Sequence, residues 1–197
     1  KRHDILKFLL DIDSSLVNEQ DDDGDTALNY AAKAKSIECV RLLVDIGANI
    51  EIANQKGCTP LIITCHTGTE AIMDLLLSKN AAVDPNTETE GVYTSALIAA
   101  SVANKVLCVK TLLKSGANVK LVDFQHYTAL CQASKAGHVE VAKELIEAGS
   151  DVNHRKPDGW TPLLLAVSEN REDVCRLLLE HGANVNIAEE SGMSPLF

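Results

Sequence analysis

The sequence predicts an all-α solenoid of stacked helix-turn-helix units joined by hairpin loops. Its first indication is a leucine that recurs with successive spacings of 33, 36, 33, 33 and 33 residues, at Leu28, Leu61, Leu97, Leu130, Leu163 and Leu196. The second is that each leucine follows, by two positions, a Ser or Thr that can cap the start of a helix. A fixed period of this length is typical of repeat proteins, in which each unit buries its apolar faces against its neighbours.

The clearest unit occupies residues 158–188. Asp158-Gly159 favours a turn, and Thr161-Pro162 supplies a capping hydroxyl followed by a residue suited to the first helical position. A short apolar helix follows and is expected to break at Glu169-Asn170. A second helix carries an apolar face made of Val174, Cys175, Leu178 and Leu179, and Gly182 is expected to end it.

The same pattern recurs along the chain. Its first half appears as DGDTALNYAA, KGCTPLIITC, TSALIAAS, HYTALCQAS and DGWTPLLLAV, and its second half as IGANIE, SGANVK, AGSDVN and HGANVN. These segments resemble ankyrin repeats over nearly the whole chain. The resemblance implies one ankyrin-repeat solenoid over residues 1–197, with a partial repeat at 1–20, full repeats at 21–53, 54–86, 87–122, 123–155 and 156–188, and a partial repeat at 189–197. We expect this array to be a segment of a longer protein.

Two departures from the family pattern bear on local structure. The histidine that usually follows the leucine supports the hairpin in the family, and other residues replace it here: Asn29, Ile62, Ile98, Cys131 and Leu164. The stretch PNTETEGVYT, residues 85–94, is three residues longer than its counterparts. It is either a partner contact or a tolerated long loop.

Two further substitutions predict backbone conformation. Asn80 replaces a helix-ending glycine and His126 replaces a turn glycine. Asn is the best substitute for glycine in the left-handed region, so we expect Asn80 to adopt that conformation.

Composition limits the classes of partner. The net charge of −10 argues against nucleic acid or an anionic membrane as the main partner. The longest weakly polar run, residues 95–109, is interrupted by Asn104 and Lys105, so no membrane insertion is expected. The six cysteines form no C-x-x-C pair, which favours small core residues in a reducing, cytoplasmic compartment, with Cys58 alone at a turn tip.

The sequence predicts no catalytic, cofactor or metal site. It contains no phosphate-binding glycine loop, no nucleophile elbow and no zinc-protease pattern. The acidic run at residues 21–25 invites comparison with a calcium loop, but the position of the closing glutamate falls on Tyr30. A solvated hairpin tip that contacts a basic partner is the favoured interpretation.

The candidate partner-binding residues follow from the resemblance, which implies that hairpin tips and first helices line a concave face. One set of candidate residues stands at the position just before the helix cap, and another stands five residues after the repeated leucine. Because most aromatic residues of this aromatic-poor chain lie on hairpins, they are included, although rings lying flat across a neighbouring hairpin are the alternative. The candidates are Tyr93, Phe124, Tyr127, Trp160, Met193, Lys33, His66, Val102, Lys135, Ser168 and Glu169.

The resemblance therefore implies a non-catalytic protein–protein interaction module, a scaffold or adaptor that binds a peptide or protein surface on its concave face and hairpin tips. The alternative is a regulatory or ligand-sensing array within a larger enzyme or channel. That alternative requires four basic residues to converge on one pocket, namely Lys33, Lys135, Arg155 and Lys156.

Overall fold

The computed structural model describes residues 14–85, 95–189, 192, 194 and 195. After a 3-10 helix, η1 (Ser14–Asn18), the described residues form five pairs of α-helices. The first helices of the pairs are α2 (Ala27–Lys33), α4 (Pro60–Thr67), α6 (Ala96–Val102), α8 (Ala129–Ala136) and α10 (Pro162–Ser168). The second helices are α3 (Ile37–Asp45), α5 (Glu70–Ser78), α7 (Val106–Lys114), α9 (Val139–Glu147) and α11 (Glu172–Glu180).

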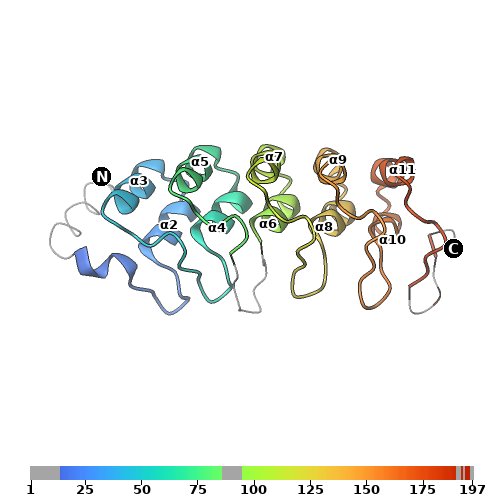
Figure 1. The fold of residues 1–197 in the computed structure, drawn as a ribbon. Helices are drawn as coiled ribbons and strands as arrows, with labels where there is room; N and C mark the ends of the chain where they lie inside the picture. Colours follow the sequence, from blue (N-terminus) through green and yellow to red (C-terminus); the bar gives the residue numbers. More distant parts are fainter. Residues whose placement is uncertain (1–13, 86–94, 190–191, 193, 196–197) are drawn as a thin grey trace.

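The pairs stack in sequence order, as Figure 1 shows. First helices pack against first helices and second helices against second helices, so two helical layers run the length of the body. The connections before α4, α8 and α10 project on the side of the first-helix layer (Figure 1). This arrangement confirms the predicted all-α solenoid.

Each first helix begins at the predicted hydroxyl. The side-chain oxygen of the capping residue accepts a hydrogen bond from the backbone amide three residues later, at 3.2–3.4 Å. This bond satisfies one of the amides that a helix start leaves without an intrahelical partner. The caps are Thr26, Thr59, Ser95, Thr128 and Thr161.

Left-handed residues follow the helices where the sequence pattern placed them. Asn80 has φ 63° after α5, and His126 has φ 62° in the hairpin before α8, so both replace glycine in the conformation expected of their positions. After the first helices the corresponding residues are Lys35, Gly68, Asn104, Gly137 and Asn170, all with positive φ.

The core is one continuous cluster along the two layers. The repeated leucine of each unit is at most 2% exposed at Leu28, Leu61, Leu97, Leu130 and Leu163. Four cysteines are also buried, and burial raises the pKa of each of these thiols: Cys58, Cys65, Cys108 and Cys131. Cys58, expected at a turn tip, directly follows the turn of residues 55–57 and is 9% exposed.

Side-chain oxygens join successive units along the loops that follow the second helices. In each case an oxygen of one unit accepts a hydrogen bond from a backbone amide of the next, at 2.7–2.8 Å. The pairs are Asn18–Asn49, Glu51–Ala82, Asp84–Asn118 and Asn153–Asn184. Lys120 occupies the corresponding position of the remaining unit, and an ammonium group cannot accept such a bond.

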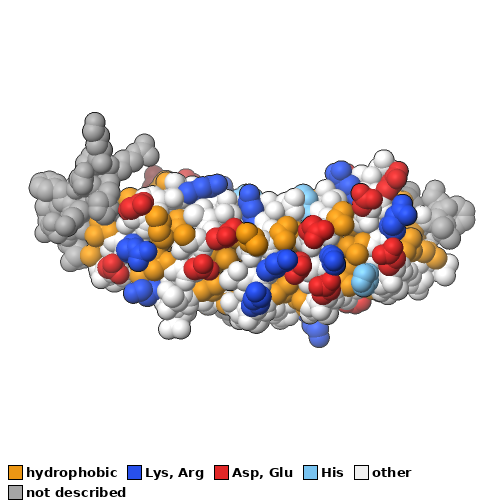
Figure 2. All heavy atoms as spheres, turned by 90° about the horizontal axis from the view of Figure 1, so that it is seen from above, with side chains coloured by type: hydrophobic (Ala, Val, Ile, Leu, Met, Phe, Trp, Pro, Cys, Tyr) orange, Lys and Arg blue, Asp and Glu red, His pale blue; other side chains and the backbone are white. Residues whose placement is uncertain are grey.

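Turns rather than paired strands build the described loops. One isolated β-bridge, between Val122 and Thr128, occurs among the described residues. Most of the long connection at 85–94 lies outside the described residues, as does most of the partial repeat at 1–20. No helix in the described ranges is long and apolar enough to cross a membrane. Seen from the second-helix layer, the surface mixes basic, acidic and apolar side chains (Figure 2).

Candidate functional site

Three described hairpins share one turn geometry. Asp21, Asn54 and Asp123 each begin a turn, and the Oδ1 atom accepts hydrogen bonds from the amides two and four residues later, at 2.8–3.0 Å. The short polar side chain thus takes the place of a backbone acceptor and fixes the hairpin tip. Lys156 stands at this position in the last full unit, and its side chain has no acceptor atom. There, Asp158 Oδ1 accepts from the Trp160 amide at 3.4 Å.

In the units of α2, α4 and α8, the residue before the cap lies on the same side as the residue eight positions later. Asp25 forms a salt bridge with Lys33, and Lys135 Nζ lies 5.4 Å from the ring centroid of Tyr127. The two residues at these positions in a third unit, Cys58 and His66, line one cavity. In these three units the residue before the cap therefore lies near the C-terminal end of the first helix of its own unit.

Tyr127 is held between two units. Lys156, from the next hairpin, places its Nζ 3.8 Å from the centroid of the Tyr127 ring, within the range of a cation–π contact. The same Nζ lies 3.1 Å from Asp158 Oδ2, and the Lys156 side chain is 6% exposed. Burial acts to lower the pKa of Lys156, but hydrogen bonds and charge interactions with Tyr127 and Asp158 outweigh it and raise the pKa. Lys156 thus stays charged and braces the ring.

The aromatic residues differ in how much surface they offer. Phe124 is 54% exposed on the hairpin before α8, whereas Tyr127 and Trp160 are half-buried. The two half-buried rings occupy the same offset in adjacent units. Met193, which shares their offset, and Tyr93, a candidate as a hairpin aromatic residue, lie outside the described residues.

The first helices place the remaining candidates near their C-terminal ends. His66 and Ser168 are exposed, as is Glu169, the residue after α10. Val102 is half-buried, and the Nε2 atom of His138 lies 3.2 Å from its carbonyl oxygen. These residues share the first-helix layer but belong to different units.

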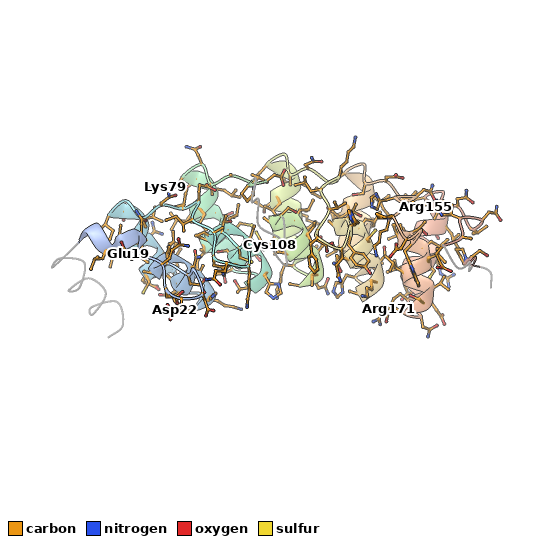
Figure 3. The ribbon with its side chains drawn as sticks, turned by 90° about the horizontal axis from the view of Figure 1, so that it is seen from below. Glu19, Asp22, Lys79, Cys108, Arg155 and Arg171 are labelled. Atoms are coloured by element: carbon orange, nitrogen blue, oxygen red, sulfur yellow. The ribbon has the colours of Figure 1, made fainter. Side chains whose placement is uncertain are left out.

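The four basic residues required by the ligand-sensing alternative do not converge. Lys135 and Lys156 meet at the Tyr127 ring. Lys33, the last residue of α2 three units earlier, instead pairs with Asp25. Arg155 donates from Nη2 to the carbonyl oxygen of Ala188, at 3.2 Å. Figure 3, seen from the hairpin side, shows how far apart these units lie: Asp22, in the same unit as Lys33, and Arg155 stand toward opposite ends of the array.

Two aspartates of the acidic run at 21–25 are engaged in contacts within the protein. Asp21 Oδ2 accepts a hydrogen bond of 2.6 Å from the Tyr30 hydroxyl, which lowers the pKa of Asp21 and raises that of Tyr30 to about 12. Asp25 is buried against Lys33 and accepts from Asn54 Nδ2 at 2.9 Å. Asp22 and Asp23 are exposed. Within the described ranges, no group of three or more His, Cys, Asp or Glu side chains is arranged to hold a metal ion.

Sequence reasoning missed a small cavity on the same layer. It has a volume of about 170 Å³ and lies between the hairpin of residues 54–58, the end of α2 and the length of α4. Its lining residues are Lys33, Asn54, Lys56, Cys58, Ile62, Ile63, His66 and Thr67. The signal available in the sequence was a small residue, Cys58, at the offset where later units carry Tyr127 and Trp160.

Stacked helix pairs, capped first helices and hairpins on one side define an ankyrin-type solenoid. A comparison with protein families agrees: the family described as "Ankyrin repeats (3 copies)" matches at residues 1–89, 46–123, 71–156 and 96–189. The chain belongs to the ankyrin-repeat family.

Individual relatives are proteins of diverse kinds. The chain is similar to the human "Transient receptor potential cation channel subfamily A member 1", with 36% identity over 107 residues, which is 53% of this chain and 9% of the channel subunit. It is 31% identical to the Arabidopsis thaliana "E3 ubiquitin-protein ligase KEG" over 55% of this chain and 7% of the ligase. It is 31% identical to the Neurospora crassa "Ankyrin repeat protein nuc-2" over 62% of this chain and 11% of that protein. The chain thus spans about a tenth of the length of these relatives.

Proposed function

We propose that this chain is a non-catalytic protein–protein interaction module, part of a scaffold or adaptor, that binds a peptide or protein surface through its hairpin tips and first helices. The observation that carries the proposal is the aromatic row on the adjacent hairpins before α8 and α10. Phe124 is 54% exposed, and Tyr127 on the same hairpin and Trp160 on the next are half-buried. Aromatic side chains of this kind supply a large share of the energy at protein interfaces.

The bracing of Tyr127 supports this assignment. Lys135 and Lys156 hold the ring from two units, so little side-chain freedom is lost when a partner covers it. The surface also alternates apolar and charged groups, because Lys135 lies on the neighbouring first helix and Asp158 on the neighbouring hairpin. Such a mixture suits a peptide that pairs an apolar anchor with polar flanks.

The cysteines support a reducing, cytoplasmic location as part of the proposal. All six thiols are free, and burial keeps four of them as small core residues rather than reactive groups.

The test is a selection of ligands from a random peptide library displayed on phage, with the affinities of selected peptides measured by calorimetry. We expect Trp160→Ala and Tyr127→Ala each to weaken binding at least ~10-fold, because truncating an interface aromatic commonly costs about 2 kcal/mol and each ~1.4 kcal/mol is a factor of ten. Circular dichroism should show that both variants stay folded.

Matched controls lie on the opposite layer. Glu147 and Glu180 are exposed on α9 and α11, the second helices of the same two units. Replacing either with alanine should leave binding unchanged. Loss of binding in these controls, with normal binding by the ring variants, would reject the assignment of the face.

A second function is favoured by the relatives alone. Two of them are a cation channel subfamily member and a ubiquitin ligase, and the chain covers less than a tenth of each. A regulatory array of a larger protein is the corresponding proposal. Deleting the array from the full-length protein distinguishes the two, because a regulatory array changes basal activity while a docking array changes only partner recruitment.

A further inference from the structure

The cavity at Cys58 occupies a place where other units hold a ring. In the unit of α8, the residue before the cap is Tyr127, and its ring lies beside Lys135, eight residues later. In the unit of α4, the same two offsets are Cys58 and His66, and both line the cavity of about 170 Å³. The volume that an aromatic side chain takes over α8 is therefore empty over α4, because cysteine is too short to fill it.

The walls of the cavity suit a ring. Ile62 and Ile63 are 0% and 7% exposed and, with Cys58, form an apolar floor. A dry, apolar cavity of about 150 Å³ is large enough to accept a benzene-sized molecule, so about 170 Å³ accommodates one aromatic side chain. The floor belongs to rigid elements, since α4 begins at the Thr59 cap and packs between α2 and α6.

The rim of the cavity is basic. Lys33, Lys56 and His66 all line it, and Lys33 also pairs with the buried carboxylate of Asp25. Lys56 is exposed, and its ammonium forms no ion pair with any acidic side chain of the described residues. Ammonium groups are attracted to the negative face of an aromatic ring, as Lys135 and Lys156 are to Tyr127 here. An apolar floor with a cationic rim complements a ring better than it does an aliphatic chain.

We propose that the cavity between the 54–58 hairpin and α4 receives a tyrosine or tryptophan side chain of the partner protein, which takes the position that Tyr127 holds in its own unit. This inference rests on the proposed interaction function and names an anchor chemistry for it. The site is separate from the aromatic row, because α6 lies between α4 and α8.

The test uses the whole chain with isotope-labelled isoleucine methyl groups and two probes, 4-methylphenol and 3-methylindole, which are the side chains of tyrosine and tryptophan. We expect saturable NMR shifts of the Ile62 and Ile63 methyl signals with dissociation constants of about 1–10 mM, a range typical of ligands with so few atoms. Cyclohexylmethanol, of similar size but without a π-face, should bind at least ~2-fold more weakly.

Filling the cavity from within should abolish the effect. Cys58→Tyr supplies the missing ring and should remove the probe-induced shifts, whereas Cys58→Ala should retain them. The methyl signal of Ile146, on α9, reports that the fold is intact in both variants. Lys56→Ala changes an exposed side chain only, and it should weaken probe binding about 2–5-fold through loss of the cation–π contact.

The inference is overturned if the wild-type chain shows no saturable shift of Ile62 or Ile63 at about 30 mM probe, several times the expected constants. It is also overturned if Cys58→Tyr binds the probes as the wild type does, or if Lys56→Ala binds them unchanged. These outcomes leave the proposed function standing, because the peptide selection tests the separate aromatic row through Tyr127 and Trp160.

Discussion

Replacing Asn29 with leucine should stabilise the protein. Asn29 lies on α2 and is 0% exposed, yet neither its Oδ1 nor its Nδ2 atom has a hydrogen-bond partner among the described residues. Other units carry Ile62, Ile98 and Leu164 at this offset, all at most 2% exposed. The environment is therefore built for an apolar side chain, and Asn29 loses its hydration without gaining a partner.

The expected gain follows from the cost of an unpaired buried group. A buried donor or acceptor without a partner costs about 1–3 kcal/mol, and leucine has nearly the shape of asparagine, so the cavity need not change. We expect Asn29→Leu to raise the free energy of unfolding by about 1–3 kcal/mol. For a chain of 197 residues, each kcal/mol corresponds to a rise in Tm of about 2–4 °C.

Urea denaturation followed by circular dichroism measures this change, with thermal melting as a second readout. Leu164→Asn is the matched inverse and should destabilise the chain, because it places an unpaired amide at the same offset of α10. If Asn29→Leu instead lowers stability, the amide must be hydrogen bonded in solution, and the reasoning from its unpaired atoms is wrong.

Three further predictions test other features of the array. Lys120→Asn should supply an acceptor for the Asp151 amide, completing the series of inter-unit bonds, and raise the free energy of unfolding by about 0.5–1 kcal/mol; Lys120→Ala, which supplies no acceptor, should not match it in urea denaturation. Asp21→Asn should bring the absorbance titration of Tyr30 down from about 12 toward its usual 10.0. The folded-state pKa of Tyr30 is raised, so the stability from this contact is complete below about pH 10 and is lost as the pH rises through about 12; an unchanged titration would show that Asp21 is not the cause. Leu178→Ala should cost about 2–5 kcal/mol by opening a cavity, with hydrogen-exchange protection lost mainly in the last two units; uniform loss along the chain would contradict nearest-neighbour coupling.

Much of the fold was predictable because each unit repeats the same local chemistry. The hydroxyl caps, such as Thr161, specify helix starts through one short-range bond, and the unusual left-handed residues Asn80 and His126 could be recognised from the glycines of neighbouring units. These features depend on residues close in sequence, and the periodic pattern gives several copies of each.

The candidate site was predictable only in part. The offset placed Tyr127 and Trp160 on adjacent hairpins, but the burial of Lys156 depends on side-chain rotamers and on a partner in the preceding unit. The cavity at Cys58 was missed for a related reason, since a missing volume is visible only when the neighbouring side chains are placed. Lys33 does not lie near Lys135, because residues at the same offset of different units share one face of the array but are separated by the units between them.

The pre-cap residue pairs with the side chain eight positions later in the units of α2 and α8, and this pairing suggests a spacing rule for a peptide that runs along the array. The two pairs are Asp25–Lys33, in the unit of α2, and Tyr127–Lys135, in the unit of α8. Packed helices stand about 8–10 Å apart, and an extended chain advances about 3.3 Å per residue. A ligand lying across the hairpins therefore meets a new unit at about every third residue. Its contacting residues would recur with a period of about three, and the positions between them would be free to vary.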